Sequence, residues 1–120
     1  MPAKRIPADV GRAAVRAFPG DRETTATAVR YLLQVLAEQA EGNTVEVRVP
    51  PFGAVQAIEG PRHTRGTPPN VVETDAATWV ALATGSQRWA EALAEGRVSA
   101  SGQRADLAHY LPVRWETMEG

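Results

Sequence analysis

Polar and apolar side chains alternate most regularly over residues 44–49, which predicts a β-strand with one face buried. One side of this strand carries Val45, Val47 and Val49, and the other carries Thr44, Glu46 and Arg48. Because one face is polar, we expect a sheet of antiparallel type that is covered on one side only. Weaker signals predict further strands over residues 54–59, 70–74 and 97–101, and a short edge strand near residues 62–65.

A long helix is predicted before the first strand, over residues 22–41. Its apolar residues recur at helical spacing, and Tyr31 and Val35 widen the apolar face. The stripe consists of Val29, Leu32, Leu33, Leu36 and Ala40. Gly42 and Asn43 are typical of the position just past a helix C-terminus, so we expect the helix to end there.

Three more helices are predicted in the second half of the chain. Thr74 or Asp75 can cap the first, which carries Trp79, Leu82 and Ala83 on one face and ends at Gly85. Ser86 can cap the second, whose stripe is Trp89, Ala90 and Leu93 and which ends at Gly96. Gly102 breaks the strand that follows. The last helix places Leu107, Tyr110 and Leu111 together at i, i+3 and i+4, and Pro112 stops it.

The first 20 residues form an extension with a short helix. Asp9 can cap this helix, whose apolar side is Val10, Ala13, Ala14 and Ala17. The helix can pack on the domain or be loosely attached to it. Alternatively, Arg12 and Arg16, one turn apart, can present a basic face to an acidic partner or a lipid surface. Two arginines on a weakly apolar helix do not make a stable membrane anchor.

The order of elements in the second half, with its glycines, resembles the C-terminal half of the sterol carrier protein-2 (SCP-2-like) family. The residues that carry this resemblance are Asp75, the turn Leu82-Ala83-Thr84-Gly85, Gly96-Arg97-Val98, Gly102 and Leu107. The run PRHTRGTPPNVVETD, residues 61–75, resembles a bacterial branch of small stand-alone members, seen mainly in actinobacteria. The resemblance covers roughly residues 24–112.

The resemblance implies an α+β fold with a five-stranded, mostly antiparallel sheet that contains one crossover. Helices cover one face, and an apolar ligand lies between sheet and helices. We therefore expect an N-terminal extension over residues 1–20, an SCP-2-like domain over 21–113 and a tail over 114–120. One hundred and twenty residues are enough for a single core without disulfides.

Composition narrows the function further. A net charge of −1 does not favour a nucleic-acid partner, because proteins that bind nucleic acids usually carry an excess of basic residues clustered on one face. The chain has no cysteine, so disulfides and thiolate chemistry are excluded, and a reducing, cytoplasmic setting is compatible with the sequence. The apolar runs are much shorter than the ~20 residues that span a bilayer. We expect neither an exported protein nor stable membrane insertion.

The sequence also argues against an enzyme. The two histidines, His63 and His109, lack the spacing of a catalytic triad or a metal site, and no phosphate-binding glycine loop occurs. Glu73 and Asp75 could form a carboxylate pair on one strand face, but a helix cap explains Asp75 better. We therefore expect no catalytic residues, no metal and no cofactor.

The apolar side chains that could line a pocket are the larger residues of the predicted helices, together with one phenylalanine in a turn. They are Tyr31, Leu32, Val35, Leu36, Phe52, Trp79, Leu82, Trp89, Leu93, Leu107, Tyr110 and Leu111. At the rim, Arg62, His63 and Arg65 could receive a carboxylate or phosphate head group, because guanidinium groups suit both. A solvated edge loop is the simpler interpretation of these three residues.

Energetics limit the size of any empty pocket. A ligand pocket begins at roughly 300 Å³, and empty apolar volume costs about 24 cal/mol per Å³. The product, about 7 kcal/mol, is a large part of a total stability of about 5–15 kcal/mol. We therefore expect either a bound apolar molecule or a collapsed pocket, which opens when the helix over 89–95 or over 107–111 shifts.

Three functions follow from the sequence, of which the weakest is an accessory domain of an enzyme. The first is non-enzymatic binding of a lipid or other apolar small molecule between sheet and helices. The second is a protein–protein interaction module, or a homodimer, in which the same fold has a filled core. A continuous apolar cavity between sheet and helices separates the first from the second.

Overall fold

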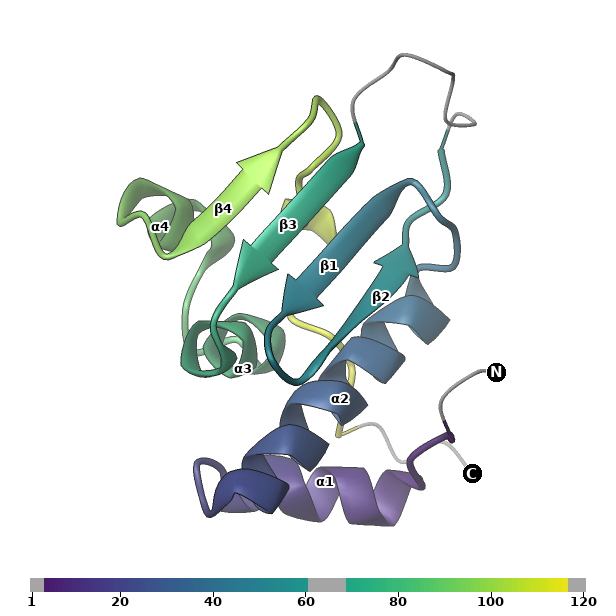
Figure 1. The fold of residues 1–120 in the computed structure, drawn as a ribbon, viewed down its shortest axis with the longest axis vertical. Coiled ribbons are helices and arrows are strands. Elements are labelled where there is room, and N and C mark those ends of the chain that lie inside the picture. The colour runs from purple at the N-terminus through teal and green to yellow at the C-terminus, as the bar shows by residue number, and fades with distance from the viewer. Residues whose placement is uncertain (1–3, 61–68, 117–120) are drawn as a thin grey trace.

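The computed structural model describes residues 4–60 and 69–116, and it has the α+β architecture that the sequence predicts. The helices are α1 (Ala8–Ala17), α2 (Arg22–Gln39), α3 (Ala76–Thr84) and α4 (Trp89–Ala94). The strands are β1 (Val45–Val49), β2 (Gly53–Ala57), β3 (Asn70–Thr74) and β4 (Val98–Ser101), followed by the short 3₁₀ helix η1 (Ala108–Tyr110). Figure 1 shows α3, α4 and η1 on the far side of the sheet, with α1 packed across α2 below it.

The sheet is mixed, with the order β2-β1-β3-β4. β1 pairs with β2 and β3 with β4 in antiparallel fashion, whereas β1 and β3 are parallel, so the crossover is present. The described residues form four strands where five were expected. The expected fifth strand, near residues 62–65, lies outside the described residues.

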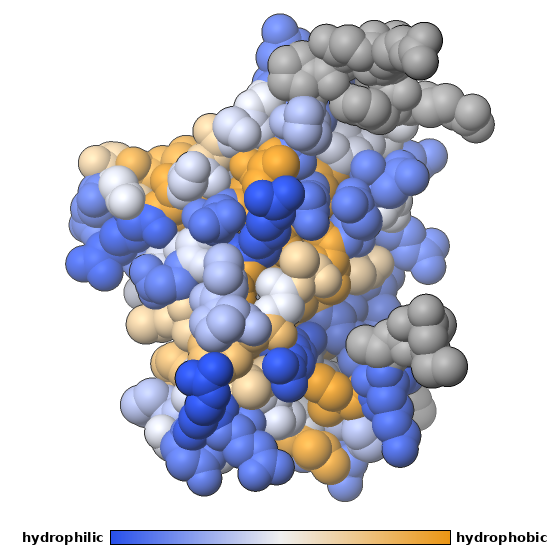
Figure 2. Space-filling view, viewed as in Figure 1, coloured by the Kyte–Doolittle hydropathy of each residue, from blue (hydrophilic) through white to orange (hydrophobic). Residues whose placement is uncertain are grey.

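One face of the sheet is buried and the other is open, as the alternation in β1 predicts. Val45, Val47 and Val49 are buried in the core, whereas Glu46 and Arg48 lie on the other face. There Arg48 lies 3.0 Å from the Glu46 carboxylate and 3.9 Å from that of Glu73 on β3. Figure 2 shows hydrophobic surface on this side only in small areas, separated by hydrophilic side chains.

Two aspartates determine where helices begin. The Asp21 carboxylate accepts a hydrogen bond from the Thr24 backbone N–H at 2.8 Å and caps α2. Asp75 does the same for α3, accepting from the Thr78 backbone N–H at 2.8 Å. Of the two caps considered for α3, Asp75 is therefore the one used. Gly85 ends α3 at φ 92°, a left-handed conformation that glycine adopts at little cost.

The polar residue expected to cap α4 does not do so. The Ser86 hydroxyl donates to the Ala81 carbonyl oxygen at 3.3 Å, so it completes the end of α3 instead. α4 begins only at Trp89, after Arg88, where the Glu91 carboxylate accepts from the Arg88 backbone N–H at 3.5 Å.

The last predicted helix is reduced to the 3₁₀ turn η1. The Asp106 carboxylate accepts from the Ala108 backbone N–H at 2.8 Å, and Tyr110 N–H donates to the Leu107 carbonyl at 2.9 Å. A hydrogen bond between residues three apart is typical of a 3₁₀ turn. The helix does not extend further, because Pro112 has no N–H to donate to the preceding turn. Leu107 is buried as expected, but Tyr110 is exposed.

The buried side of α1 also differs from the predicted stripe. Gly11, Ala14 and Val15 face α2, whereas Val10, expected on the apolar side, is 49% exposed. Pro7 stands at the N-cap position, so Asp9 lies within the first turn and does not cap it. A Cβ on Gly11 would lie 2.1 Å from Cγ of Tyr31, so the close approach of α1 to α2 requires a glycine there.

Candidate functional site

The seam between the sheet and the helices is filled by core side chains. Eight of the twelve residues predicted to line a pocket are buried in the core: Tyr31, Leu32, Val35, Leu36, Trp79, Leu82, Trp89 and Leu107. Of these, Tyr31 lies with its ring against Gly11 of α1. Trp79 is fully buried, and its indole N–H donates to the carbonyl oxygen of Val29 on α2 at 3.3 Å. The sequence predicts either a bound apolar molecule or a collapsed pocket, and this packing corresponds to the collapsed pocket. As ligand contacts, these residues remain predictions.

At one end of the seam, α3, α4 and the segment after η1 enclose a hollow of about 320 Å³. Three predicted pocket residues meet there: Leu82, Trp89 and Leu111. Leu93 and Tyr110 point less inward, with 40% and 38% of their surface exposed. The twelfth predicted residue, Phe52, lies elsewhere, in the turn before β2.

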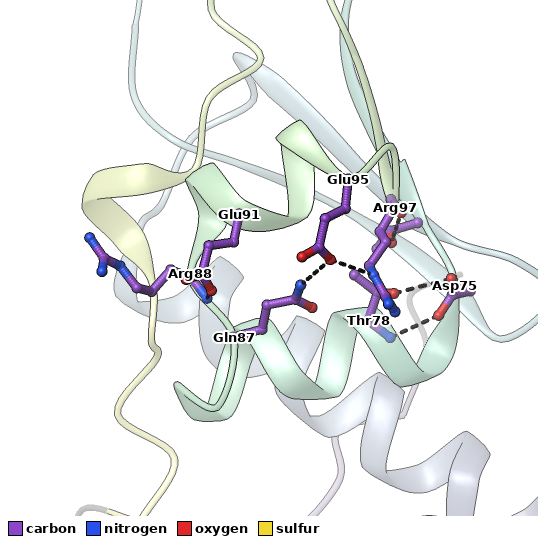
Figure 3. Close-up of polar contacts among 8 residues, drawn as sticks. Asp75, Thr78, Gln87, Arg88, Glu91, Glu95 and Arg97 are labelled. Atoms are coloured by element: carbon purple, nitrogen blue, oxygen red, sulfur yellow. Dashed lines mark hydrogen bonds and ion pairs between the residues drawn. The ribbon is translucent and has the colours of Figure 1, made fainter.

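α4 roofs this hollow with few buried contacts of its own. Its buried residues are Trp89 and Ala92. Figure 3 shows the polar contacts beside it: the Glu95 carboxylate accepts from the Gln87 amide at 3.1 Å and from the Arg97 guanidinium at 2.7 Å. Both buried residues of α4 belong to the hydrophobic core, so the helix is held by Trp89 and Ala92 as well as by these polar contacts.

A larger groove, with a volume of about 730 Å³, runs between α2 and the edge strand β2. Its lining comes from α2, from the start of β2 and from the N-terminal segment: Lys4, Arg5, Ile6, Thr27, Arg30, Leu33, Gln34, Ala37, Glu38, Glu41, Phe52, Gly53, Ala54 and Val55. Phe52 is the predicted pocket residue it contains. Phe52 and Val55 give it apolar walls, and the fully buried Leu33 lies beneath them.

Gly53 keeps this groove open. A Cβ built on Gly53 would lie 3.6 Å from Cγ of Arg30 and 3.6 Å from Cδ1 of Leu33, which is ordinary contact. A larger residue could therefore replace Gly53 without a backbone clash. Its side chain would then occupy part of the groove that the glycine leaves empty.

Charge is unevenly distributed along the groove. At the end near the β1–β2 turn, the Arg30 Nε donates to the Phe52 carbonyl oxygen at 2.6 Å, and the Arg22 guanidinium lies 5.4 Å from the centre of the Phe52 ring. Further along α2, Glu38 and Glu41 line the groove, and Glu38 pairs with Arg5. The groove therefore offers apolar walls with a cationic end.

The predicted rim residues fall outside what the structure describes. Arg62, His63 and Arg65 lie in the 61–68 gap, so their role as an anion-binding rim stays a prediction. Among residues 4–60 and 69–116, no group of three or more histidine, aspartate or glutamate side chains could hold a metal ion. In the same ranges, no helix has the length and hydropathy needed to cross a bilayer.

A protein-family model described as "Bacterial SCP ortholog" matches residues 21–113 of the chain. The chain belongs to this family. The match supports the SCP-2-like resemblance and agrees with the mixed sheet and covering helices of the structure. It begins at the cap of α2, so α1 and the preceding segment lie outside it. Among curated proteins, none matches this chain.

The groove is the feature that the sequence reasoning missed. Thr27, Arg30 and Gln34 lie on the polar side of α2, which the hydrophobic pattern assigns to solvent. The signal that could have revealed it is Gly53, a glycine at the start of a strand where its backbone needs no positive φ. Such a glycine often marks a place where something approaches the backbone closely.

Proposed function

We propose that this bacterial SCP-family chain is a non-enzymatic binder of an elongated, mostly apolar small molecule of lipid type, held in the α2–β2 groove. The observation that carries the proposal is the groove itself: about 730 Å³ of space with apolar walls at the sheet edge. That volume falls within the roughly 300–1,000 Å³ typical of small-molecule sites. The hollow at the end of the seam is smaller, with a volume of about 320 Å³.

Burial of apolar surface supplies the affinity in this proposal. Each square ångström of apolar ligand surface removed from water contributes about 25 cal/mol. Phe52 and Val55, both half-buried, provide the apolar contacts, and Ile6 adds a third from the N-terminal segment. The groove is open on one side, so we expect an affinity below that of an enclosed site with the same lining.

Arg30 is the group that would orient the ligand. Its Nε is engaged with the Phe52 carbonyl, which fixes the guanidinium at the groove end. The Nη atoms make no further hydrogen bond within the described residues and remain able to donate to a carboxylate, phosphate or sulfonate. We therefore expect a preference for ligands with an anionic head group over neutral ones.

Two measurements test this proposal. Native mass spectrometry of protein purified without detergent is expected to show a retained small-molecule mass on the monomer. Titration with 1-anilinonaphthalene-8-sulfonate, an apolar dye with one sulfonate, is expected to show one site that Gly53→Leu blocks. The matched control is Ala90→Leu, which adds the same side chain at the smaller hollow. Equal binding by both variants and the unaltered chain would place the ligand outside the groove.

A second candidate function, an interaction or dimerisation module, is favoured by the filled seam and by the exposed Leu93 and Tyr110 beside the smaller hollow. A dimer without a retained ligand mass would support it. In that case Leu93→Glu is expected to shift the dimer to the monomer, because it places a charge in the apolar contact.

A further inference from the structure

Residues 4–6, which precede α1, form the third wall of the α2–β2 groove. Two hydrogen bonds hold this segment to α2: Ile6 N–H donates to Oε1 of Gln34 at 2.9 Å, and Nε2 of Gln34 donates to the Ile6 carbonyl at 3.0 Å. A side-chain amide that pairs with both backbone groups of one residue holds an extended segment in one register. The Arg5–Glu38 ion pair adds a second attachment one turn further along α2.

The segment is anchored at its C-terminal end, where α1 packs on α2. The Gly11 N–H donates to the Pro7 carbonyl at 2.9 Å, and Gly11 lies against the Tyr31 ring. Residues 4–6 precede Pro7, and their described contacts with α2 are few. They are the two hydrogen bonds between Gln34 and the Ile6 backbone, the Arg5–Glu38 ion pair and the packing of the partly buried Ile6 side chain. If these contacts were released, residues 4–6 could move away from α2 while α1 stayed folded, because α1 is held to α2 at Gly11 and Tyr31.

We propose that residues 4–6 act as a strap that belongs to the ligand site: it closes over the bound molecule, and Gln34 is the residue that positions it. This inference rests on the proposed function. The family match covers residues 21–113, so this wall lies outside the matched part of the chain. Ile6 gives the ligand an apolar contact, and Lys4 and Arg5 bring positive charge to the groove.

The strap predicts slow ligand release from the closed state and faster release when it is loosened. The test compares Gln34→Ala with Gln39→Ala in the full chain. Gln39 is a matched control on the same helix: its Nε2 donates to the Arg114 carbonyl at 3.1 Å and its Oε1 accepts from Arg114 N–H at 3.0 Å. Each substitution therefore removes the same bidentate clamp, but only one of them touches the groove.

Dissociation of 1-anilinonaphthalene-8-sulfonate is the first readout. Loss of two hydrogen bonds is expected to speed dye release by about 5–30-fold in Gln34→Ala, with no change in Gln39→Ala. Gln34→Glu, which keeps the acceptor and loses the donor, is expected to fall between Gln34→Ala and the unaltered chain. Hydrogen exchange of the Ile6 amide is the second readout, and it is expected to quicken by a similar factor in Gln34→Ala alone. Circular dichroism checks that each variant is folded.

The outcomes separate the strap from the proposed function. If the unaltered chain binds the dye in the groove but Gln34→Ala releases it at the same rate, the strap is structural only and the inference fails while the function stands. If the Ile6 amide of the unaltered chain exchanges as fast as an unstructured amide, the closed strap is wrong. If the unaltered chain binds no dye, the proposed function falls, and the strap's role in retention falls with it.

Discussion

Replacing Gly11 with alanine tests how closely α1 lies on α2. On helix propensity alone, Gly11→Ala should stabilise the chain by about 0.8–1 kcal/mol, because alanine loses less backbone entropy. The structure predicts the opposite. A Cβ at this position would lie 2.1, 2.2 and 2.6 Å from three ring atoms of Tyr31, where carbon atoms normally stay about 3.5–4.0 Å apart.

The size of the effect follows from that overlap. α1 would have to withdraw by more than 1 Å, on the order of the missing separation, or Tyr31 would have to leave its buried position. Overpacking of this kind costs typically 1–3 kcal/mol. Set against the propensity gain, the net result is a destabilisation of about 0–2 kcal/mol. The strap should also loosen, because its anchor is displaced.

Urea denaturation gives the free energy of unfolding for Gly11→Ala, for Tyr31→Ala and for the double variant. We expect Tyr31→Ala to remove the clash, so that Gly11→Ala becomes neutral or stabilising in that background. Val10→Ala is a control for propensity on the exposed side of the same helix. A Gly11→Ala protein that is about 1 kcal/mol more stable than the unaltered chain would refute the packing of α1 on Tyr31.

Three further predictions concern the filled seam and the helix caps. Trp79→Ala should cost about 3–5 kcal/mol, because it empties a fully buried position and removes the indole N–H that donates to the Val29 carbonyl in addition to the helix backbone. A loss below about 1 kcal/mol in urea denaturation would mean that the seam is not tightly packed. Asp75→Ala should cost about 0.5–2 kcal/mol by removing the cap of α3, whereas Asp75→Asn should cost less, and equal losses would argue against a capping role. Asp21→Ala should show a pH-dependent loss. The Thr24 backbone N–H lowers the pKa of the Asp21 carboxyl, so this carboxylate stabilises the fold above its ordinary unfolded pKa of about 4, and the stabilisation disappears as pH falls through the lowered folded value. Thermal melts of Asp21→Ala and the unaltered chain should therefore converge in acid, and a difference that persists unchanged at low pH would contradict this.

The parts of the fold that sequence reasoning predicted are those set by local chemistry. The alternation of Val45, Val47 and Val49 locates β1, and glycines such as Gly85 mark helix ends because their backbone conformation is costly for other residues. Asp75 was one of two possible caps. Choosing between it and Thr74 needed the structure, in which the Thr74 hydroxyl donates to the Arg97 carbonyl at 2.7 Å instead.

Features that depend on contacts between distant segments were not predictable in the same way. The helix expected at 107–111 has the correct apolar spacing, but Asp106 and Pro112 restrict it to one turn. In α1, the predicted stripe began at Val10 and left out Val15, whereas the buried face contains Gly11, Ala14 and Val15. Gly11 has no side chain to signal burial. A hydrophobic pattern locates the buried face of a helix from its apolar side chains. It therefore does not detect a face that packs through a glycine.

The same reason explains the candidate site. Every large apolar residue was a possible pocket residue, and the sequence could not separate those that fill the core from those that line a hollow. Trp79 and Leu107 proved to be core, whereas Phe52 lines the groove. The polar wall, formed by Arg30 and Gln34, becomes visible only when β2 and the N-terminal segment are placed beside α2.

The most direct test of the groove as the ligand site is an amide chemical-shift map. Uniformly ¹⁵N-labelled protein is titrated with 1-anilinonaphthalene-8-sulfonate and followed by two-dimensional NMR. The largest shifts are expected at Ile6, Leu33, Gly53 and Val55, which line the groove. Shifts centred on Trp89 and Leu111, or spread over the open face of the sheet, would contradict it.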